Sequence, residues 1–234
     1  MPLSKETLDF LIENRVRDSR VWFQEHKTVY RRVVLEPLQE LVTALTPVML
    51  EIDDRVICEP RVDKTICRIW RDTRFSKDPS LYRDTMWIIF KRDRMHSTAY
   101  PGLYIELGPD GFNYGCGFYD ASPGYMNHLR EKILGNSPAF TAAGRAYEAQ
   151  SVFQMEGEFY RRPRYAGEPA GLRNWLERRN IAFIAGSRDF PLLYSDRLAD
   201  KLAADFRVLK PIYDFLLQTA LEESQTAALP PRMV

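Results

Sequence analysis

The sequence predicts an α+β protein in which a mainly antiparallel sheet is packed by N-terminal and C-terminal helices. Three observations lead to this class. Apolar residues recur at helical spacing over residues 1–50 and again over 195–223. Short stretches rich in β-branched and aromatic residues follow one another over 60–120, separated by turn residues. The segment GPDG at 108–111 joins two of these stretches and is typical of an antiparallel hairpin.

The first fifty residues are predicted to form helices that pack on another element. Ser4 is a suitable N-cap for the first helix, in which Leu8 and Leu11 lie on one apolar side. Asp18 is expected to cap a second helix. Pro37 is expected to begin or kink a third, because a straight helix tolerates a proline ring only in its first turn.

The sheet is predicted from four stretches, which read TICRIW (65–70), TMWIIF (85–90), LYIEL (103–107) and FNYGCGFY (112–119). Side chains alternate between the two faces of a strand. In the last stretch four side chains therefore share one face, namely Phe112, Tyr114, Cys116 and Phe118. On the other face, Gly115 and Gly117 leave room for another backbone or a ligand, and we expect a packed helix there.

Residues 123–225 are predicted to be mostly helical, with one further strand, IAFIA, at 181–185. Shorter helices are expected at 123–135, 138–149 and 172–179. Residues 195–223 are expected to form one long helix, or a pair bent near Pro211. We interpret residues 1–234 as one domain, with a helical part (1–50), a sheet that carries the motif described below (60–120) and the mostly helical remainder.

Composition is that of a folded chain without a strong overall charge. The 234 residues are 45% hydrophobic, which excludes a disordered protein, and the net charge of +1 provides no general attraction to nucleic acid or anionic lipid. Charge is unevenly distributed, however. Residues 61–94 hold ten Lys or Arg against five Asp, an excess of five positive charges, so the rest of the chain carries a net charge of −4.

Neither metal, cofactor nor membrane is expected from the residue pattern. The three cysteines, Cys58, Cys67 and Cys116, form no C-x-x-C pair, and the three histidines show no zinc-ligand spacing. No signal peptide and no apolar run long enough to span a bilayer are expected. We therefore expect a cytoplasmic protein, and the sequence leaves its oligomeric state open.

The strongest candidate site is the segment RIWRDTRFSKD at 68–78, where a predicted strand passes into a polar loop. Guanidinium groups bind phosphate or carboxylate through paired hydrogen bonds, so we expect a small anionic ligand here. The residues expected to bind it are Arg68, Arg71, Arg74, Ser76, Tyr82 and Arg83. Asp72 and Asp78 are the candidates for orienting the arginines or moving a proton.

Two other interpretations stay open. In the first, the arginines pair with Asp72, Asp78 and other acids in an internal salt-bridge network, and the protein is a structural or interaction module. In the second, the basic segment and its aromatic residues bind nucleic acid, which the low net charge disfavours. The excess positive charge of the segment favours the anion site, because a purely structural network should balance its charges. Whether the protein is an enzyme is not decided by these residues.

One further residue is a candidate general base. Glu106 lies in the predicted strand 103–107, on the face opposite Ile105 and Leu107. It would serve as a base if the sheet brings it to the arginines. The alternative is an exposed or salt-bridged strand glutamate.

The chain resembles a widespread bacterial family of uncharacterised proteins, a domain of unknown function. The family is marked by R-x-x-RD-x-RFS-x-D after a strand, which residues 68–78 match, and by R-x-WF on an N-terminal helix, which Arg20, Trp22 and Phe23 match. The resemblance implies an α+β fold and no established activity. The chain departs from the pattern at Arg17 and Asp18, where members usually have two asparagines. It also departs after the long motif, where Pro79, Leu81 and Arg83 replace a lysine, a proline and a lysine.

Overall fold

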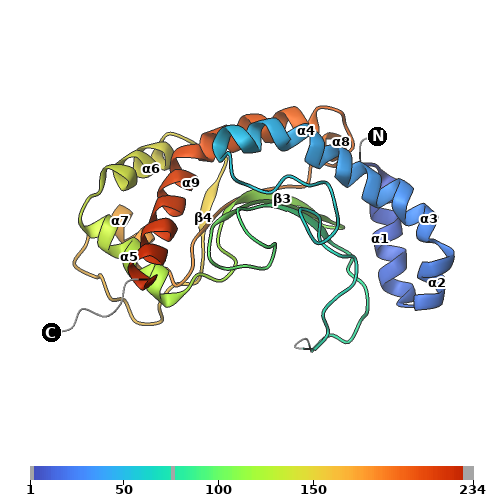
Figure 1. Cartoon of the computed structure of the whole chain (residues 1–234), viewed down its shortest axis with the longest axis horizontal. Helices are drawn as coiled ribbons and strands as arrows, with labels where there is room; N and C mark the ends of the chain where they lie inside the picture. Colours follow the sequence, from blue (N-terminus) through green and yellow to red (C-terminus); the bar gives the residue numbers. More distant parts are fainter. Residues whose placement is uncertain (1–2, 75–76, 229–234) are drawn as a thin grey trace. The chain divides into compact units, whose positions relative to one another are not determined.

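The structure, a computed structural model, describes residues 3–74 and 77–228, with side chains described as far as Gln225. Helices precede and follow a sheet whose neighbouring strands run in the order β1-β2-β3-β5-β4 (Figure 1). The pairs β1–β2 and β4–β5 are antiparallel. The predicted α+β class with a mainly antiparallel sheet is therefore confirmed.

The strands are β1 (Met86–Phe90), β2 (Gly102–Gly108), β3 (Gly111–Gly117), β4 (Gln154–Glu156) and β5 (Ala182–Ser187). The N-terminal helices are α1 (Lys5–Arg17), α2 (Arg20–Glu25), α3 (Lys27–Tyr30), the π-helix η1 (Arg31–Leu35) and α4 (Glu36–Ile52). The later helices are α5 (Pro123–Leu134), α6 (Pro138–Glu148), α7 (Ala170–Leu176), α8 (Phe190–Leu193) and α9 (Leu198–Ala228). The expected helix near 195–223 is thus one element, with Pro211 inside it.

The chain divides into two compact units. Unit 1 comprises Met1–Met95, Leu103–Tyr114 and Gly186–Phe206. Unit 2 comprises His96–Gly102, Gly115–Ala185 and Arg207–Val234. The candidate site predicted from the sequence lies wholly in unit 1.

In unit 1, α1 begins after the expected cap, Ser4, and ends at Asp18, which was expected to cap the next helix. Ser4 is the N-cap, and its backbone N–H donates to Thr7 Oγ1 at 3.1 Å. Asp18 does not cap α2, so that expectation was wrong. It adopts a left-handed conformation (φ 44°) that ends α1, and Ser19 caps α2 by accepting from the Trp22 N–H. The carboxylate of Asp18 accepts instead from the Leu81 N–H at 2.7 Å.

The helices α3, η1 and α4 form one continuous run from Lys27 to Ile52. Pro37 lies in the first turn of α4, as expected. The run is long and apolar enough to cross a membrane by length and composition alone, which the sequence analysis did not anticipate. Half of its most apolar window is buried within the protein, and α4 contacts β1, so the run also fits the core helix of a globular protein.

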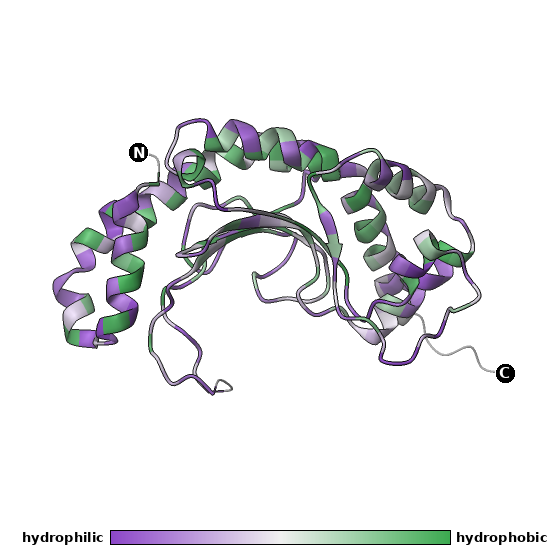
Figure 2. Cartoon of the chain, turned by 180° about the vertical axis from the view of Figure 1, so that it is seen from behind, coloured by the Kyte–Doolittle hydropathy of each residue, from purple (hydrophilic) through white to green (hydrophobic). Residues whose placement is uncertain are grey.

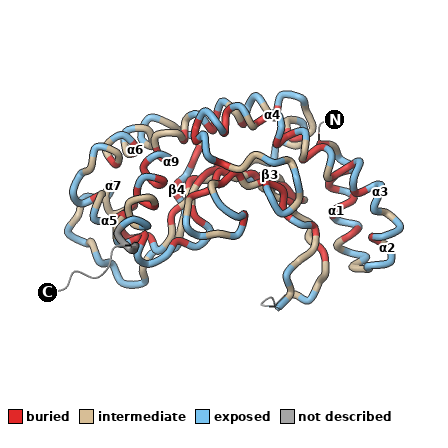
Figure 3. The backbone as a smooth tube through the Cα atoms, in the orientation of Figure 1, coloured by how far each residue is buried: buried red, intermediate tan, exposed pale blue. Residues whose placement is uncertain are grey.

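Helices in both units carry polar and apolar residues side by side along their length, as amphipathic helices do (Figure 2). In β1 and β2, alternate residues are buried and half-exposed. The buried face includes Met86, Ile88 and Ile105, and buried residues lie both in the strands and along the helices (Figure 3). The other face of the two strands carries Trp87 and Glu106, which are direct cross-strand partners. This second face is half-exposed and is where the site develops.

The β2–β3 hairpin has the predicted position, with Pro109 and Asp110 between its strands. The four residues expected on one face of β3, which are Phe112, Tyr114, Cys116 and Phe118, are all buried. The expectation of a helix over the two glycines of β3 was wrong. A Cβ atom at Gly115 would lie 1.9 Å from the Phe183 carbonyl oxygen, and one at Gly117 would lie 2.6 Å from Ala182 Cα. The backbone of β5 therefore occupies the space that these glycines leave.

In unit 2, α5 packs through the predicted stripe. Tyr125, Leu129 and Ile133 are all buried, and the Tyr125 hydroxyl donates to the Leu216 carbonyl of α9 at 3.2 Å. The short strand β4 was not predicted, because only Met155 of its three residues is buried and the sequence offers no longer pattern.

Candidate functional site

The motif lies in a hairpin loop at the edge of the sheet. Residues 65–71 run antiparallel to 81–89, with bridges at Ile66–Ile88 and Trp70–Tyr82. These bridges are isolated, so the prediction of a regular strand over 65–70 was wrong. The segment nevertheless covers the edge of β1, because the Cys67 N–H donates to the Trp87 carbonyl and the Ile89 N–H donates to the Thr65 carbonyl.

Three of the predicted arginines bind internal acids. Arg68 Nε lies 2.9 Å from an oxygen of Asp63, and both side chains are largely exposed. Arg74 forms a two-bond pair with Asp72, at 3.0 Å through Nε and 2.7 Å through Nη2. Arg71 contacts Asp78, as described next. For these three arginines the contacts are those of the salt-bridge interpretation.

Asp78 joins the motif to the N-terminal helices. One of its oxygens, Oδ2, accepts from Arg15 of α1 at 2.5 Å and from Arg71 at 2.7 Å. The other oxygen, Oδ1, accepts from the backbone N–H and the hydroxyl of Ser80. Arg15 also donates to the carbonyl of Tyr82 at 3.2 Å. Asp78 is therefore held between helix and loop.

The two candidate proton-transfer residues are stabilised as anions. Hydrogen bonds from Arg74, first through its side chain and then through its backbone, lower the pKa of Asp72 to about 2. Hydrogen bonds from Ser80, followed by Arg15, lower the pKa of Asp78 well below its usual range. A general acid or base works best when its pKa lies near the working pH. These two carboxylates are therefore better placed to orient arginines than to move protons.

Tyr82 lies in a different setting from the one expected for a ligand-binding residue. Tyr82 has no exposed surface, and its ring packs 4.3 Å from Trp70 and 5.1 Å from Phe23 between centroids. It therefore packs inside the protein, and its buried hydroxyl has no hydrogen-bond partner among the described residues. Ser76, together with Phe75, lies outside the described residues.

Arg83 is the predicted arginine whose setting differs from the others. Its guanidinium carbon lies 4.2 Å from the centre of the Trp87 ring, and the side chain is half-buried. Its Nε is buried and has no hydrogen-bond partner among the described residues, nor does any described acid form an ion pair with this side chain. Burial lowers the pKa of Arg83, and the nearby charges of Arg71 and Arg68 lower it further. A positive charge is thus held partly out of water without an ion-pair partner among the described residues.

Glu106 lies beside this arginine. It is directly opposite Trp87 in the β1–β2 pairing, and cross-strand Cβ atoms at such positions are about 4.5–5.5 Å apart. Burial raises the pKa of Glu106, and the charge of Arg83 partly offsets this rise. The sheet therefore brings Glu106 near an arginine of the predicted set, which was the condition for its role as a base. Cys67, by contrast, is no nucleophile, because burial raises its pKa to about 12.

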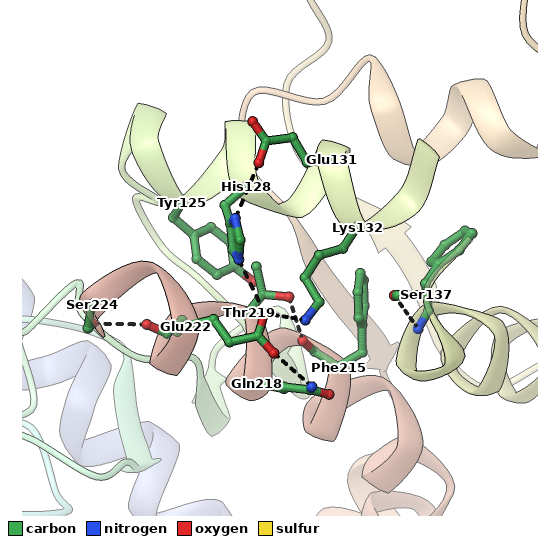
Figure 4. Close-up of polar contacts among 12 residues, drawn as sticks. Tyr125, His128, Glu131, Lys132, Ser137, Phe215, Gln218, Thr219, Glu222 and Ser224 are labelled. Carbon is green, nitrogen blue, oxygen red and sulfur yellow. Dashed lines mark hydrogen bonds and ion pairs between the residues drawn. The ribbon is translucent and has the colours of Figure 1, made fainter. Parts of the chain in front are cut away.

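A second polar cluster lies in unit 2, between α5 and α9 (Figure 4). Glu222 Oε2 accepts from Lys132 at 2.6 Å and lies 3.3 Å from His128 Nε2, while its other oxygen accepts from Gln218 at 2.8 Å. The hydrogen bond from Lys132 is the main cause of a lowered pKa at Glu222. Since each of these groups has a partner, we interpret the cluster as a structural contact that holds α5 and α9 together.

A family model for conserved hypothetical proteins, DUF2461, matches residues 6–215. The chain belongs to this family. The matched range contains both segments on which the resemblance was based, and it confirms a domain of unknown function. No curated protein and no solved structure matches the chain significantly.

In this DUF2461 chain, sequence reasoning did not single out two residues near the predicted set: Trp87, whose ring lies under Arg83, and Arg188, which lines a cavity together with Glu106. Trp87 was assigned to a strand without a functional role, and Arg188 was not considered. The sequence carried a signal for Trp87, because residues two positions apart share one face of a strand and Trp87 follows Arg83 by four positions. Arg188 follows the predicted strand 181–185 by three residues, but the sequence alone does not show which other strand end it meets.

Proposed function

We propose that the chain binds a small anion, through a phosphate or carboxylate group, on the half-exposed sheet face beside Arg83. The observation that carries the proposal is the half-buried guanidinium of Arg83, whose buried Nε has no partner among the described residues. Burying a charge without a partner is costly, whereas a bidentate anion satisfies both the charge and the donor. Glu106 lies on the same face of the sheet, opposite Trp87, and the charge of Arg83 acts on it.

The surroundings of Arg83 support an anion rather than another partner. The ring of Trp87 beneath the guanidinium restricts its orientation, as stacked arginines are restricted in general. Arg68 contacts Asp63 through Nε. Its terminal nitrogens have no partner within the described parts of the chain. An anion bound at Arg83 would also relieve the repulsion from the neighbouring charges of Arg71 and Arg68.

Calorimetric titration with inorganic phosphate and with succinate, at low salt, tests the proposal. Arg83→Gln is expected to weaken binding of at least one probe by about tenfold or more, the loss of a charged hydrogen-bonding partner. Arg83→Lys is expected to give an intermediate affinity, because it keeps the charge and loses the planar fork. The matched control is Arg94→Gln, which removes one exposed positive charge beyond the opposite end of β1 and should change affinity by no more than about twofold.

Two results would refute an anion site at Arg83. In one, the wild-type protein binds neither probe at millimolar concentration. In the other, Arg83→Gln binds as tightly as wild type while its melting temperature shows that it is folded.

A structural role for the motif is the second candidate, favoured by Asp78. This carboxylate binds Arg15 of α1 and Arg71 of the loop at once, which is the arrangement expected of an internal network. The two roles are compatible, since a loop fixed by Asp78 would also hold Arg71 near Arg83. A nucleic-acid partner has less support, because internal acids already form ion pairs with three arginines of the motif.

We also propose a cytoplasmic location. The three cysteines are free thiols, which is typical of a reducing compartment. Cell fractionation tests this location. A bacterial origin is proposed separately, from the sequence resemblance.

A further inference from the structure

A cavity of about 650 Å³ lies in unit 1, where the β2–β3 turn meets the end of β5. Its wall includes Glu106 of β2, Asn113 of β3, Arg188 after β5, and Asp84 and Thr85 before β1. Small-molecule sites commonly have volumes of about 300–1,000 Å³. The cavity is therefore large enough for a metabolite or for part of one.

The wall of this cavity carries charges of both signs. Glu106 and Asp84 are half-buried and Arg188 is exposed. None of the three forms a hydrogen bond or an ion pair through its side chain with any residue that the structure describes. Charged side chains that serve the fold alone are usually paired when they leave water, as the half-buried Asp78 is. These three groups are free to contact a ligand.

Glu106 is common to the cavity and to the anion site. It lines the cavity, it is opposite Trp87 in the sheet, and its carboxylate interacts electrostatically with Arg83. The guanidinium of Arg83 lies over Trp87, and Trp87 pairs directly with Glu106 of the cavity wall, so Glu106 connects the anion site to the cavity.

We infer that the ligand is a zwitterion, whose phosphate or carboxylate binds at Arg83 and whose protonated amine enters the cavity beside Glu106 and Asp84. This inference rests on the proposed function. An ammonium group has three donors and no acceptor, so it is complementary to carboxylates that lack donors of their own. Burial raises the pKa of Glu106, and a cation bound beside it would offset this rise.

Two matched pairs of probes test the inference by calorimetric titration. O-phosphoethanolamine is compared with ethyl phosphate, and 4-aminobutyrate with butyrate, so that each pair differs only by the amine. In the wild-type protein, the amine-bearing member of at least one pair is expected to bind about tenfold more tightly. Glu106→Gln is expected to reduce that preference to about threefold or less, because the amide keeps the shape and loses the charge. Asp84→Asn provides a second variant should Glu106→Gln fail to fold.

The matched control is Glu25→Gln, which removes one exposed negative charge on α2 and should leave the preference unchanged. Equal affinity for both members of each pair in the wild-type protein would overturn the zwitterion and leave the anion site standing. A preference that persists in both Glu106→Gln and Asp84→Asn would also overturn it. Absence of binding by all four probes, together with phosphate and succinate, would remove the anion site and this inference with it.

Discussion

Replacement of Arg92 by alanine is expected to destabilise unit 1 strongly. Asp53, the residue that ends α4, has no exposed side-chain surface, and Arg92 just after β1 is 14% exposed. The pair makes two hydrogen bonds, from Arg92 Nε at 2.7 Å and from Nη2 at 2.8 Å. Arg92→Ala removes this cation from a carboxylate that water cannot reach.

Removing one partner of a buried ion pair costs roughly 3–5 kcal/mol in free energy of unfolding. The lower end applies here, because the Arg55 N–H still donates to Asp53 at 3.1 Å and Arg92 is not fully buried. A loss of about 3 kcal/mol in a chain of this length lowers the melting temperature by about 6–12 °C.

Urea and thermal unfolding followed by circular dichroism measure the effect. The matched control is Lys5→Ala, which breaks a pair whose side chains are 80% and 55% exposed and should change stability by less than about 0.5 kcal/mol. The double variant Asp53→Asn/Arg92→Ala is expected to recover part of the loss, since a neutral amide is less costly to bury. A loss below about 1 kcal/mol in Arg92→Ala would refute the reasoning that the pair is buried and mutually dependent.

Three further predictions concern other positions. Asp78→Asn should make stability depend less on pH in the acidic range. Hydrogen bonds from Ser80 lower the pKa of Asp78, so its ionised form stabilises the fold at pH values above the ordinary pKa of 3.8. This stabilisation is lost as the pH falls through the lowered pKa. Melting temperatures recorded from neutral to acidic pH check this, and an unchanged profile would contradict it. Gly115→Ala should disrupt the contact of β3 with β5, because the new Cβ would lie 1.9 Å from the Phe183 oxygen; near-wild-type melting would contradict it. Gly144→Ala, inside α6 with open space around the new Cβ, should instead raise stability by about 0.5–1 kcal/mol in the same assay.

Elements with a strong local signal could be predicted from the sequence. The β2–β3 hairpin follows from its turn residues, and α5 follows from the spacing of Tyr125, Leu129 and Ile133. The prediction failed where contacts distant in the sequence decide the conformation. Residues 65–70 have the composition of a strand, but loop 72–80 joins them to 81–89 and the pairing is irregular.

The contacts of the motif could be predicted from the sequence only in part. Asp78 was a possible partner of the arginines in the salt-bridge interpretation, whereas the pairing of Arg68 with Asp63 became known only from the structure. Arg83 stood last in the predicted set. Its contact with the Trp87 ring depends on how the two side chains pack, which no local pattern predicts. The cavity beside Glu106 combines residues from three segments, which no local pattern brings together.

The π-helical turn Arg31–Leu35 has a consequence for how this protein tolerates change. A π turn accommodates one more residue than an α turn, and each α-helical residue rotates the chain by about 100°. Within this turn the Val33 carbonyl accepts from Thr7 of α1, and after it α4 contacts β1. Deleting one amino acid within the turn would rotate α4, including the buried Leu38, by about 100° relative to α3, whereas most single substitutions there would keep the rotation. Among homologous chains, length should therefore be more constrained than identity at this point.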